Sequence, residues 1–468
     1  METNLGLPLQ EEVSHTPDAL RPTALHERIS SMDIIRGVAV LGILIMNVLA
    51  FGLPEAMGGN PTLFGTNKAL NEGVWFVESA FLNGSMRGLF SLLFGAGVIL
   101  LTSNRETQNS SLSIADIYYR RLLWLLAFGM ADAYLLLWYG DILYAYAICG
   151  LFLFPFRNVK PGYLLLAGIL CFSSLTFKMY LRDKDFLKKK ETAALAIKLK
   201  NQKKKLTEEQ EGALKEWTET KKKFEPASQK KEAEKDMAKV GGGYVSNFKR
   251  SAEISEKVQS TFFYHIGFLD IIGMMLIGMA FYQLGILSGK WENKYYLIML
   301  VGGYTVGLAL GLYPAIIIQQ NGYNPTLFVE KLIASFPVNL YEFRRLFVAL
   351  GHIGLVMLIY KMRLLPWLMK ALSAVGRMAF TNYVLQTIIC SFVFYGFGFN
   401  LFGKLQRYEL YYVVAAVWVF QLIISPIWLH YFQFGPLEWC WRSLTYWQRQ
   451  PMTKEQPHPE EKQVTVVA

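Results

Sequence analysis

Residues 34–53, IIRGVAVLGILIMNVLAFGL, decide the fold class of this 468-residue chain. The stretch holds a single charged residue, Arg36. A helix of this length, at about 1.5 Å per residue, matches the roughly 30 Å hydrocarbon core of a bilayer. Apolar residues cover every side of this helix, whereas a surface helix of a soluble protein keeps one polar face. The stretch therefore predicts a helix that spans a membrane.

Similar apolar blocks recur along the whole chain, separated by short polar stretches. Together they predict ten transmembrane helices, at residues 34–53, 86–103, 121–139, 142–157, 162–180, 262–287, 294–318, 344–361, 378–398 and 410–431. Residues 71–85 are amphipathic, so we expect them to lie at the interface or to re-enter the membrane. The predicted fold is all-α, a polytopic transmembrane helix bundle in contact with the lipid bilayer.

Polar segments divide the chain into five expected parts. These are a polar tail at 1–27, a first membrane half at 28–180, a charged insertion at 181–260, a second membrane half at 261–448 and a polar tail at 449–468. The insertion holds 21 Lys or Arg and 14 Asp or Glu, so it supplies +7 of the net charge of +11. Because the basic excess is local, we expect no nucleic-acid partner. We expect this insertion to be a solvated, partly disordered helical hairpin, or alternatively a partner-binding surface.

The distribution of basic residues predicts the orientation of the bundle. An even number of spans places both termini on one side of the membrane. The short loops on that side hold more Lys and Arg than those on the other side, and positive loops face the cytoplasm. We therefore expect a multi-pass protein of the cell (inner) membrane, with both termini cytoplasmic and the insertion outside.

Ionisable groups inside a membrane cost roughly 2.5–3.5 kcal/mol on insertion scales, so each indicates a pair or a functional site. Asp33 and Arg36 share a helix face at the start of the first span. They are expected to form a cap and an ion pair, or to hold an anionic group. Asn47 lies about three turns further along that face, where it would join helices or contact a substrate.

Two further charges lie inside predicted spans. Arg87 begins the second span and is expected to meet Glu72 or Glu78, to reach toward the interface, or to contact a substrate. Asp132 lies deep in the third span and needs a partner on another helix, water, or a proton. The candidate partners are Arg87, Arg344 and Arg345. Asp141 follows a glycine and is expected to cap the next helix.

The second half of the chain adds polar groups at span ends and interiors. His352 lies well inside a span, as a hydrogen-bonded structural residue or as an acid–base group. Arg377 and Asn382 begin the ninth span. Near the C-terminus, Glu438 and Arg442 are four residues apart, which favours an ion pair in an interfacial helix.

Motifs for nucleotide binding and hydrolysis are absent from the sequence. It contains no Walker loop, no G-x-S-x-G, no H-E-x-x-H and no dinucleotide fingerprint. No His or Cys cluster has metal-ligand spacing. We therefore expect no metal site and no permanently bound cofactor.

Several stretches of the chain resemble the YeiB-like family of bacterial membrane proteins. They are residues 28–47, 90–95, 138–143, 376–383 and 434–443. The resemblance covers nearly the whole chain outside 1–27 and about 181–240. It implies the multi-span fold more firmly than any reaction, since the family is largely uncharacterised.

The start of the first span is also similar, more distantly, to membrane acyltransferases typified by heparan-α-glucosaminide N-acetyltransferase. Those enzymes share an Asp-x-x-Arg-Gly start and a later Asn, which Asp33, Arg36 and Asn47 would match. They move an acyl group from cytoplasmic acyl-CoA to an acceptor outside. They also carry a His in the outside loop after the first span, whereas residues 51–85 here contain none. An acyl relay would need another base or a direct transfer.

The first functional hypothesis is therefore a transmembrane acyltransferase with acyl-CoA as co-substrate. Arg120 and Arg121 would contact its phosphates, because Arg suits phosphate recognition. Asn47 and Arg87 would polarise the acyl carbonyl. The candidate catalytic residues are His352, Asp132 and Asn47. The candidate substrate-binding residues are Asp33, Arg36, Arg87, Arg120, Arg121, Arg344, Arg345, Arg377 and Asn382.

Two other hypotheses stay open. In a transporter or exporter of a small anionic molecule, the buried charges of the third and eighth spans would line the path. A non-catalytic membrane scaffold would use the charged insertion to bind a partner.

Overall fold

The computed structural model describes residues 30–103, 111–335 and 340–454. The predicted tail at 1–27 and most of the tail at 449–468 lie outside these residues. The helices are, in chain order, α1 (Ser30–Gly52), α2 (Glu55–Gly59), α3 (Lys68–Val77), η2 (Glu78–Leu82), α4 (Ser85–Ser103), α5 (Ser111–Tyr134), α6 (Leu143–Leu153), η4 (Phe154–Asn158), α7 (Pro161–Asn201), α8 (Glu208–Lys223), α9 (Pro226–Val240), α10 (Tyr244–Lys257), η5 (Val258–Gly267), α11 (Phe268–Gln283), α12 (Asn293–Gln320), α13 (Pro325–Ser335), α14 (Tyr341–Lys361), α15 (Pro366–Arg377), α16 (Ala379–Phe394), α17 (Leu410–Tyr431) and α18 (Pro436–Tyr446).

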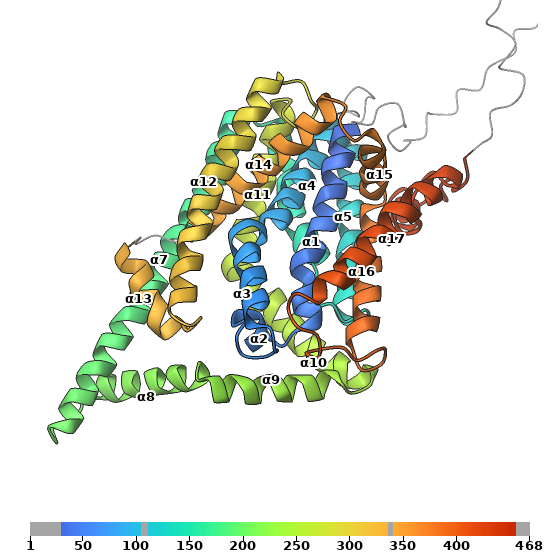
Figure 1. Ribbon diagram of the computed structural model, residues 1–468. Coiled ribbons are helices and arrows are strands. Elements are labelled where there is room, and N and C mark those ends of the chain that lie inside the picture. The colour runs from blue at the N-terminus through green and yellow to red at the C-terminus, as the bar shows by residue number, and fades with distance from the viewer. Residues whose placement is uncertain (1–29, 104–110, 336–339, 455–468) are drawn as a thin grey trace, which may run out of the picture.

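The described chain forms a bundle of long apolar helices, as predicted (Figure 1). Within it, seven helical stretches are long and apolar enough to cross a membrane: Ser30–Gly52, Lys68–Ser103, Pro161–Asn201, Tyr244–Gln283, Asn293–Gln320, Tyr341–Lys361 and Leu410–Tyr431. The other predicted spans fall on α5, on α6 with η4, and on the shorter apolar α16. The all-α, polytopic membrane fold is thus confirmed.

Glycines bring the central helices into backbone contact. On α4 and α11, a Cβ added at Gly95 would lie 1.9 Å from the carbonyl oxygen of Met275, and one at Gly278 would lie 2.0 Å from that of Leu92. A Cβ at Gly376 of α15 would lie 1.8 Å from the Asp33 carbonyl oxygen of α1. Small residues drive such close packing in membranes, where the hydrophobic effect gives helices little reason to associate.

The amphipathic segment predicted at 71–85 enters the bundle as α3 and η2 and continues into α4 after a break. Gly84, at φ +76°, makes the turn at this break. The Arg344 guanidinium of α14 donates to the carbonyl oxygens of Ser79 (2.6 Å) and Asn83 (2.5 Å). In lipid, carbonyl groups that a broken helix leaves unpaired need such a donor. Arg344 therefore stabilises the break between η2 and α4.

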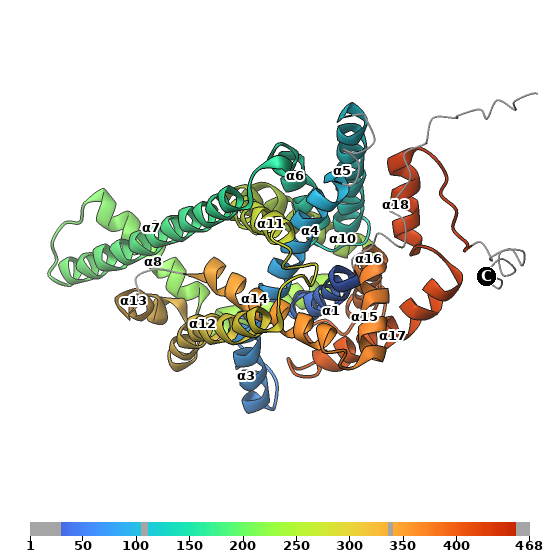
Figure 2. The same cartoon turned by 90° about the horizontal axis from the view of Figure 1, so that it is seen from above.

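The insertion is helical and packs along one end of the bundle (Figure 1). There Val240 at the end of α9 accepts a hydrogen bond from the Gly396 amide (2.9 Å), and Arg250 of α10 pairs with Asp236 of α9 (2.6 Å). Figure 2 shows α7 and α8 reaching out to one side of the bundle, away from α18. The end of α7 and α8 form the expected helical hairpin, whereas the contacts of α9 and α10 with the bundle were not predicted. Neighbouring helices and the 395–403 loop hold this segment.

Candidate functional site

A cavity of about 250 Å³ lies within the end of the bundle where α1 begins. Helices α1, α4, α5, α6, α15, α16 and α18 contribute to its walls. Much of the wall is apolar, including Phe90, Leu93, Phe94, Leu122, Leu125 and Phe380. Ligand sites in proteins usually combine such apolar walls with a few placed polar groups.

Four arginines line this cavity, Arg36, Arg121, Arg377 and Arg442, against two carboxylates, Asp33 and Glu438. All four arginines are partly exposed. Arg36 pairs with Asp33 at 2.7 Å, as the sequence spacing predicted. The Arg121 guanidinium lies over the Trp441 ring, 3.9 Å from its centroid. Arg377 donates to the Gln433 carbonyl at 3.4 Å, and its buried Nε has no hydrogen-bond partner among the described residues.

Glu438 lines the cavity and also caps another helix. Its Oε1 accepts hydrogen bonds from the backbone amides of Phe380 (2.7 Å) and Thr381 (3.1 Å), at the N-terminus of α16. Burial raises the pKa of this carboxyl, and the hydrogen bonds it accepts offset part of that effect. This contact fixes α18 against the bundle and so places Trp441 and Arg442 at the cavity. Four arginines against two carboxylates leave the site with a net positive charge.

The inner part of the cavity reaches a tyrosine. The Tyr383 hydroxyl accepts hydrogen bonds from Trp138 Nε1 (3.1 Å) and from the Ile142 amide (3.2 Å). It also donates to Asp141 Oδ1 at 3.4 Å. The other oxygen of Asp141 accepts from the Tyr144 amide at 2.8 Å, which confirms the predicted helix cap. Tyr383 thus separates the cavity from Asp141.

Behind Tyr383 lies a pair of carboxyl groups. Asp132 is only 1% exposed, and its side chain interacts with those of Asp141 and Thr387. No N–H or O–H group in the described part of the chain donates a well-formed hydrogen bond to either Asp132 oxygen. Two carboxylates at close range in a buried site repel each other, and one proton held between them relieves the repulsion. The pair is therefore suited to take up and release a proton.

The predicted partners of Asp132 are wrong, because Arg87 and Arg345 pair with another acid and Arg344 donates to backbone carbonyl groups. Asp270 of α11 accepts two hydrogen bonds from Arg345 (2.8 and 2.5 Å) and one from Arg87 (3.2 Å). The expected pairing of Arg87 with Glu72 or Glu78 is wrong for the same reason. Arg345 and Asp270 are almost fully buried. This three-residue cluster joins α4, α11 and α14 beside the cavity.

The other candidate residues are bonded to residues away from the cavity or lie outside its lining. His352 Nδ1 is 2.7 Å from the Tyr304 hydroxyl, between α14 and α12. Arg120 pairs with Asp116 at 2.5 Å. Asn382 donates to the Val375 carbonyl and to Ser425. Asn47 is partly exposed on α1.

The structure thus sorts the predicted site residues into two groups. Those at or directly behind the cavity are Asp33, Arg36, Arg121, Arg377 and Asp132. Those outside its lining are Asn47, Arg87, Arg120, Arg344, Arg345, His352 and Asn382. Sequence reasoning missed Tyr383 as a site residue, and it treated Arg442 only as part of an interfacial helix. Their signal was the 376–383 and 434–443 stretches, which carried the family resemblance.

The fold and the cavity define a polytopic α-helical membrane protein with an arginine-lined, largely apolar cavity. The chain belongs to the YeiB family. It is 31% identical over 444 residues to "Uncharacterized protein YeiB" of Escherichia coli (strain K12), which covers 90% of this chain and 96% of that protein. It is 28% identical over 450 residues to "Uncharacterized protein YxaH" of Bacillus subtilis (strain 168), 93% of this chain and 99% of that protein.

A family described as "Protein of unknown function (DUF418)" matches residues 281–448. This region includes α12 to α18. Two of the four cavity arginines, Arg377 and Arg442, fall within it, and Arg36 and Arg121 fall before it. No solved structure matches the chain significantly. The comparisons therefore establish the family but identify no reaction, so any functional proposal rests on the geometry of the cavity.

Proposed function

We propose that this protein is a transmembrane acyltransferase that takes its acyl group from acyl-CoA bound in the α1-end cavity. One observation carries the proposal: four arginines surround an apolar cavity that leads to Tyr383 and the carboxyl pair behind it. An acyl-CoA has a polyanionic head and a slim, less polar arm that ends in the acyl group. The cavity has the complementary order of charge and polarity.

The arginines would hold the phosphates of the donor. A guanidinium presents several N–H donors in a fixed fork, and its bonds to phosphate are charge-assisted. Arg121 and Arg377 have supporting contacts with Trp441 and the Gln433 carbonyl, which limit their side-chain freedom. With the head group at the arginines, the arm would enter between α4, α5 and α16 and bring a short acyl group toward Tyr383.

The carboxyl pair would serve as the proton acceptor through Tyr383. An acceptor hydroxyl or amine attacks the thioester carbonyl carbon. Its proton passes to the Tyr383 oxygen, in place of one of the two N–H groups that this oxygen accepts from, as the Tyr383 proton passes to Asp141. The carbon–sulfur bond then breaks, and the thiolate takes the proton back from the pair. The products are the acylated acceptor and free CoA. In this scheme Asp132 and Asp141 replace His352 as the base.

The proposal fits an orientation in which the arginine-lined end faces the cytoplasm, where acyl-CoA is found. Both termini would then be cytoplasmic in the cell (inner) membrane, and the acceptor would be extracytoplasmic. No permanently bound cofactor is part of the proposal.

Binding of acetyl-CoA to purified protein in nanodiscs, measured by calorimetry, tests the donor site. Arg121→Gln should weaken binding about ten-fold or more, because a charge-assisted hydrogen bond contributes about 1.5–3 kcal/mol. Arg120→Gln is the matched control: it is the adjacent residue, also stacked on a tryptophan, but outside the cavity lining. Equal binding by both variants, or none by the parent protein, would contradict the donor site.

Carriage of a small anionic molecule is the second candidate, favoured by the four arginines that line the α1-end cavity. Liposomes loaded with doubly labelled acetyl-CoA separate the two functions. An acyltransferase passes the acetyl label to an acceptor or to water and leaves CoA behind, whereas a carrier moves an intact labelled molecule across the bilayer.

A further inference from the structure

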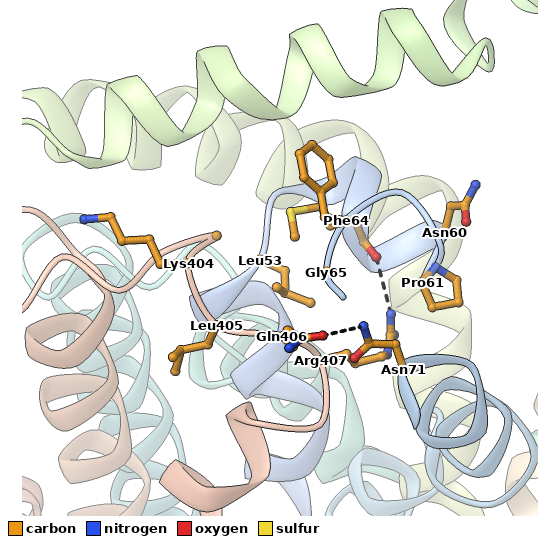
Figure 3. A pocket seen from close by; sticks show the side chains of 12 residues that line it. Leu53, Asn60, Pro61, Phe64, Gly65, Asn71, Lys404, Leu405, Gln406 and Arg407 are labelled. Carbon is orange, nitrogen blue, oxygen red and sulfur yellow. Dashed lines mark hydrogen bonds between the residues drawn. The ribbon is translucent and has the colours of Figure 1, made fainter. Parts of the chain in front are cut away.

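The second cavity, of about 130 Å³, lies just beyond the C-terminal end of α1. Figure 3 shows its walls, which come from Leu53, the loop around Phe64, the start of α3 at Asn71, and the loop with Gln406 and Arg407. It shares no lining residue with the arginine-lined cavity.

The charge of this cavity is already compensated. Arg407 pairs with Glu78 at 2.7 Å, and both side chains are almost fully buried. Its remaining N–H groups donate to the carbonyl oxygens of Met57 and Gly58 at 3.2–3.3 Å. Because this guanidinium has no spare charge to offer, it does not select an anionic ligand. Lys404 is exposed at the rim.

The polar groups left for a ligand are side-chain amides. Asn71, only 2% exposed, donates to Gln406 Oε1 at 3.4 Å, and its own Oδ1 has no hydrogen-bond partner among the described residues. The Gln406 amide nitrogen makes long bonds, 3.3 Å to Thr66 and 3.4 Å to Tyr408, and its Oε1 also accepts from the Asn67 amide at 3.1 Å. A ligand hydroxyl would replace one of the two long bonds. A buried acceptor without a donor is costly. The Asn71 Oδ1 is closed off from the cavity in this structure, so a ligand hydroxyl would satisfy it after a rotation of the Asn71 side chain.

We propose that this cavity binds a small uncharged molecule that carries several hydroxyl groups, in the size range from glycerol to a monosaccharide. Hydroxyl groups both donate and accept, so they match the amides of Asn71 and Gln406. The apolar faces of Leu53 and Phe64 would lie against the C–H groups of the ligand. This inference does not depend on the acyl-transfer proposal.

The insertion holds the walls of this cavity in place. Helix α9 contacts α2, and the side chain of Met237 on α9 lies against Gly403, one of the lining residues. A Cβ at Gly403 would lie 2.8 Å from Met237 Cγ. Figure 3 shows a helix of the insertion running past the cavity. The charged insertion therefore has a role in positioning this site.

Ligand-detected NMR on the full chain in nanodiscs, in buffer free of glycerol, tests the site with glycerol, glucose and glucose 6-phosphate as probes. Glucose or glycerol should give saturation transfer with a millimolar Kd, and the phosphate should not improve it. Asn71→Leu should weaken the binding at least ten-fold. Asn71→Asp, which keeps an acceptor oxygen, should weaken it less. Asn321→Leu, a change of the same type outside the cavity, should leave it unaltered.

A second variant keeps the test decisive if Asn71→Leu does not fold. Phe64→Ala removes a partly exposed ring from the wall and should weaken glucose or glycerol binding several-fold. The inference is overturned by absence of binding in the parent protein, by equal binding in the parent, Asn71→Leu and Phe64→Ala proteins, or by tighter binding of the phosphorylated sugar. Acetyl-CoA binding measured on the same samples reports separately on the donor cavity.

Discussion

Asp270 pairs with more arginines than any other carboxylate described above. It faces two guanidinium groups, from Arg345 and Arg87, on two neighbouring helices. A buried ion pair of this kind gives little net stability when intact, but removal of one partner leaves an uncompensated charge. In a membrane this penalty has no water to reduce it.

Replacement of Asp270 by Asn should therefore destabilise the protein by about 3–5 kcal/mol, the usual effect of breaking a buried pair. The free energy of unfolding in mixed micelles measures this change. Asp185→Asn is the control, because Asp185 is exposed and pairs with Lys189 on the surface of α7. Surface pairs of this kind contribute at most about 1 kcal/mol. Similar losses in the two variants would contradict the assigned role.

The sequence predicted which residues were costly but only some of their partners. Asp33 and Arg36 are three apart in one helix, so their contact followed from helix geometry. The partners of Asp270 were not predictable, because they lie 75 and 183 residues away and only packing brings them together. Arg121 was a predicted phosphate contact and does line the cavity, whereas Arg120 beside it does not.

Among the helices, α4 and α11 pack closely against each other because each has a glycine at the contact. Gly95 and Gly278 each face a carbonyl oxygen of the other helix. Gly97 lies on α4 only two residues from Gly95, yet no atom of another element lies within 4 Å of a Cβ built there. The same helix therefore offers a contact glycine and its own control.

Gly95→Ala should destabilise the bundle by about 1–3 kcal/mol, the usual cost of overpacking, because the two backbones must move apart. Gly97→Ala should be neutral or slightly stabilising, since Gly is a poorer helix former than Ala. Thermal unfolding of both variants in the same detergent gives the comparison. A Gly95→Ala protein as stable as the parent would show that the two helices are not in backbone contact.

Element boundaries were predictable where apolar length decided them, and α1 and α17 begin and end within a few residues of the expected spans. The break after η2 was not, because it depends on Arg344, which comes from a distant part of the chain. The docking of α9 was missed for a related reason. Its Lys and Glu content suggested solvent, while contacts through residues such as Met237 and Val240 hold it to the bundle.

For the molecule as a whole, orientation is the prediction on which the donor site most depends. Lys370 on α15 lies at the end where α1 begins, and Lys404 lies at the other end. Both are exposed. With the arginine-lined cavity toward the cytoplasm, Lys404 faces the outside and Lys370 faces the inside.

Single Lys404→Cys and Lys370→Cys variants, in a background without the four native cysteines, test this orientation. A membrane-impermeant maleimide should label Lys404→Cys in intact cells and Lys370→Cys only after lysis. The opposite pattern would put the arginine-lined cavity on the outside and remove cytoplasmic acyl-CoA as its ligand.

The length of the apolar surface on helix α7 limits how thin the bilayer around this protein can be. Its 41 residues extend about 60 Å, roughly twice the thickness of the hydrocarbon core. Exposed apolar side chains run from Tyr163 to Leu181, with Lys178 the one charged residue among them, and a run of charged residues begins at Arg182. Since the far end of α7 is tied to α8, tilting is a poor way to adjust. A much thinner bilayer would leave Phe177 and Leu181 in water, so the protein should partition away from thin regions of a mixed membrane.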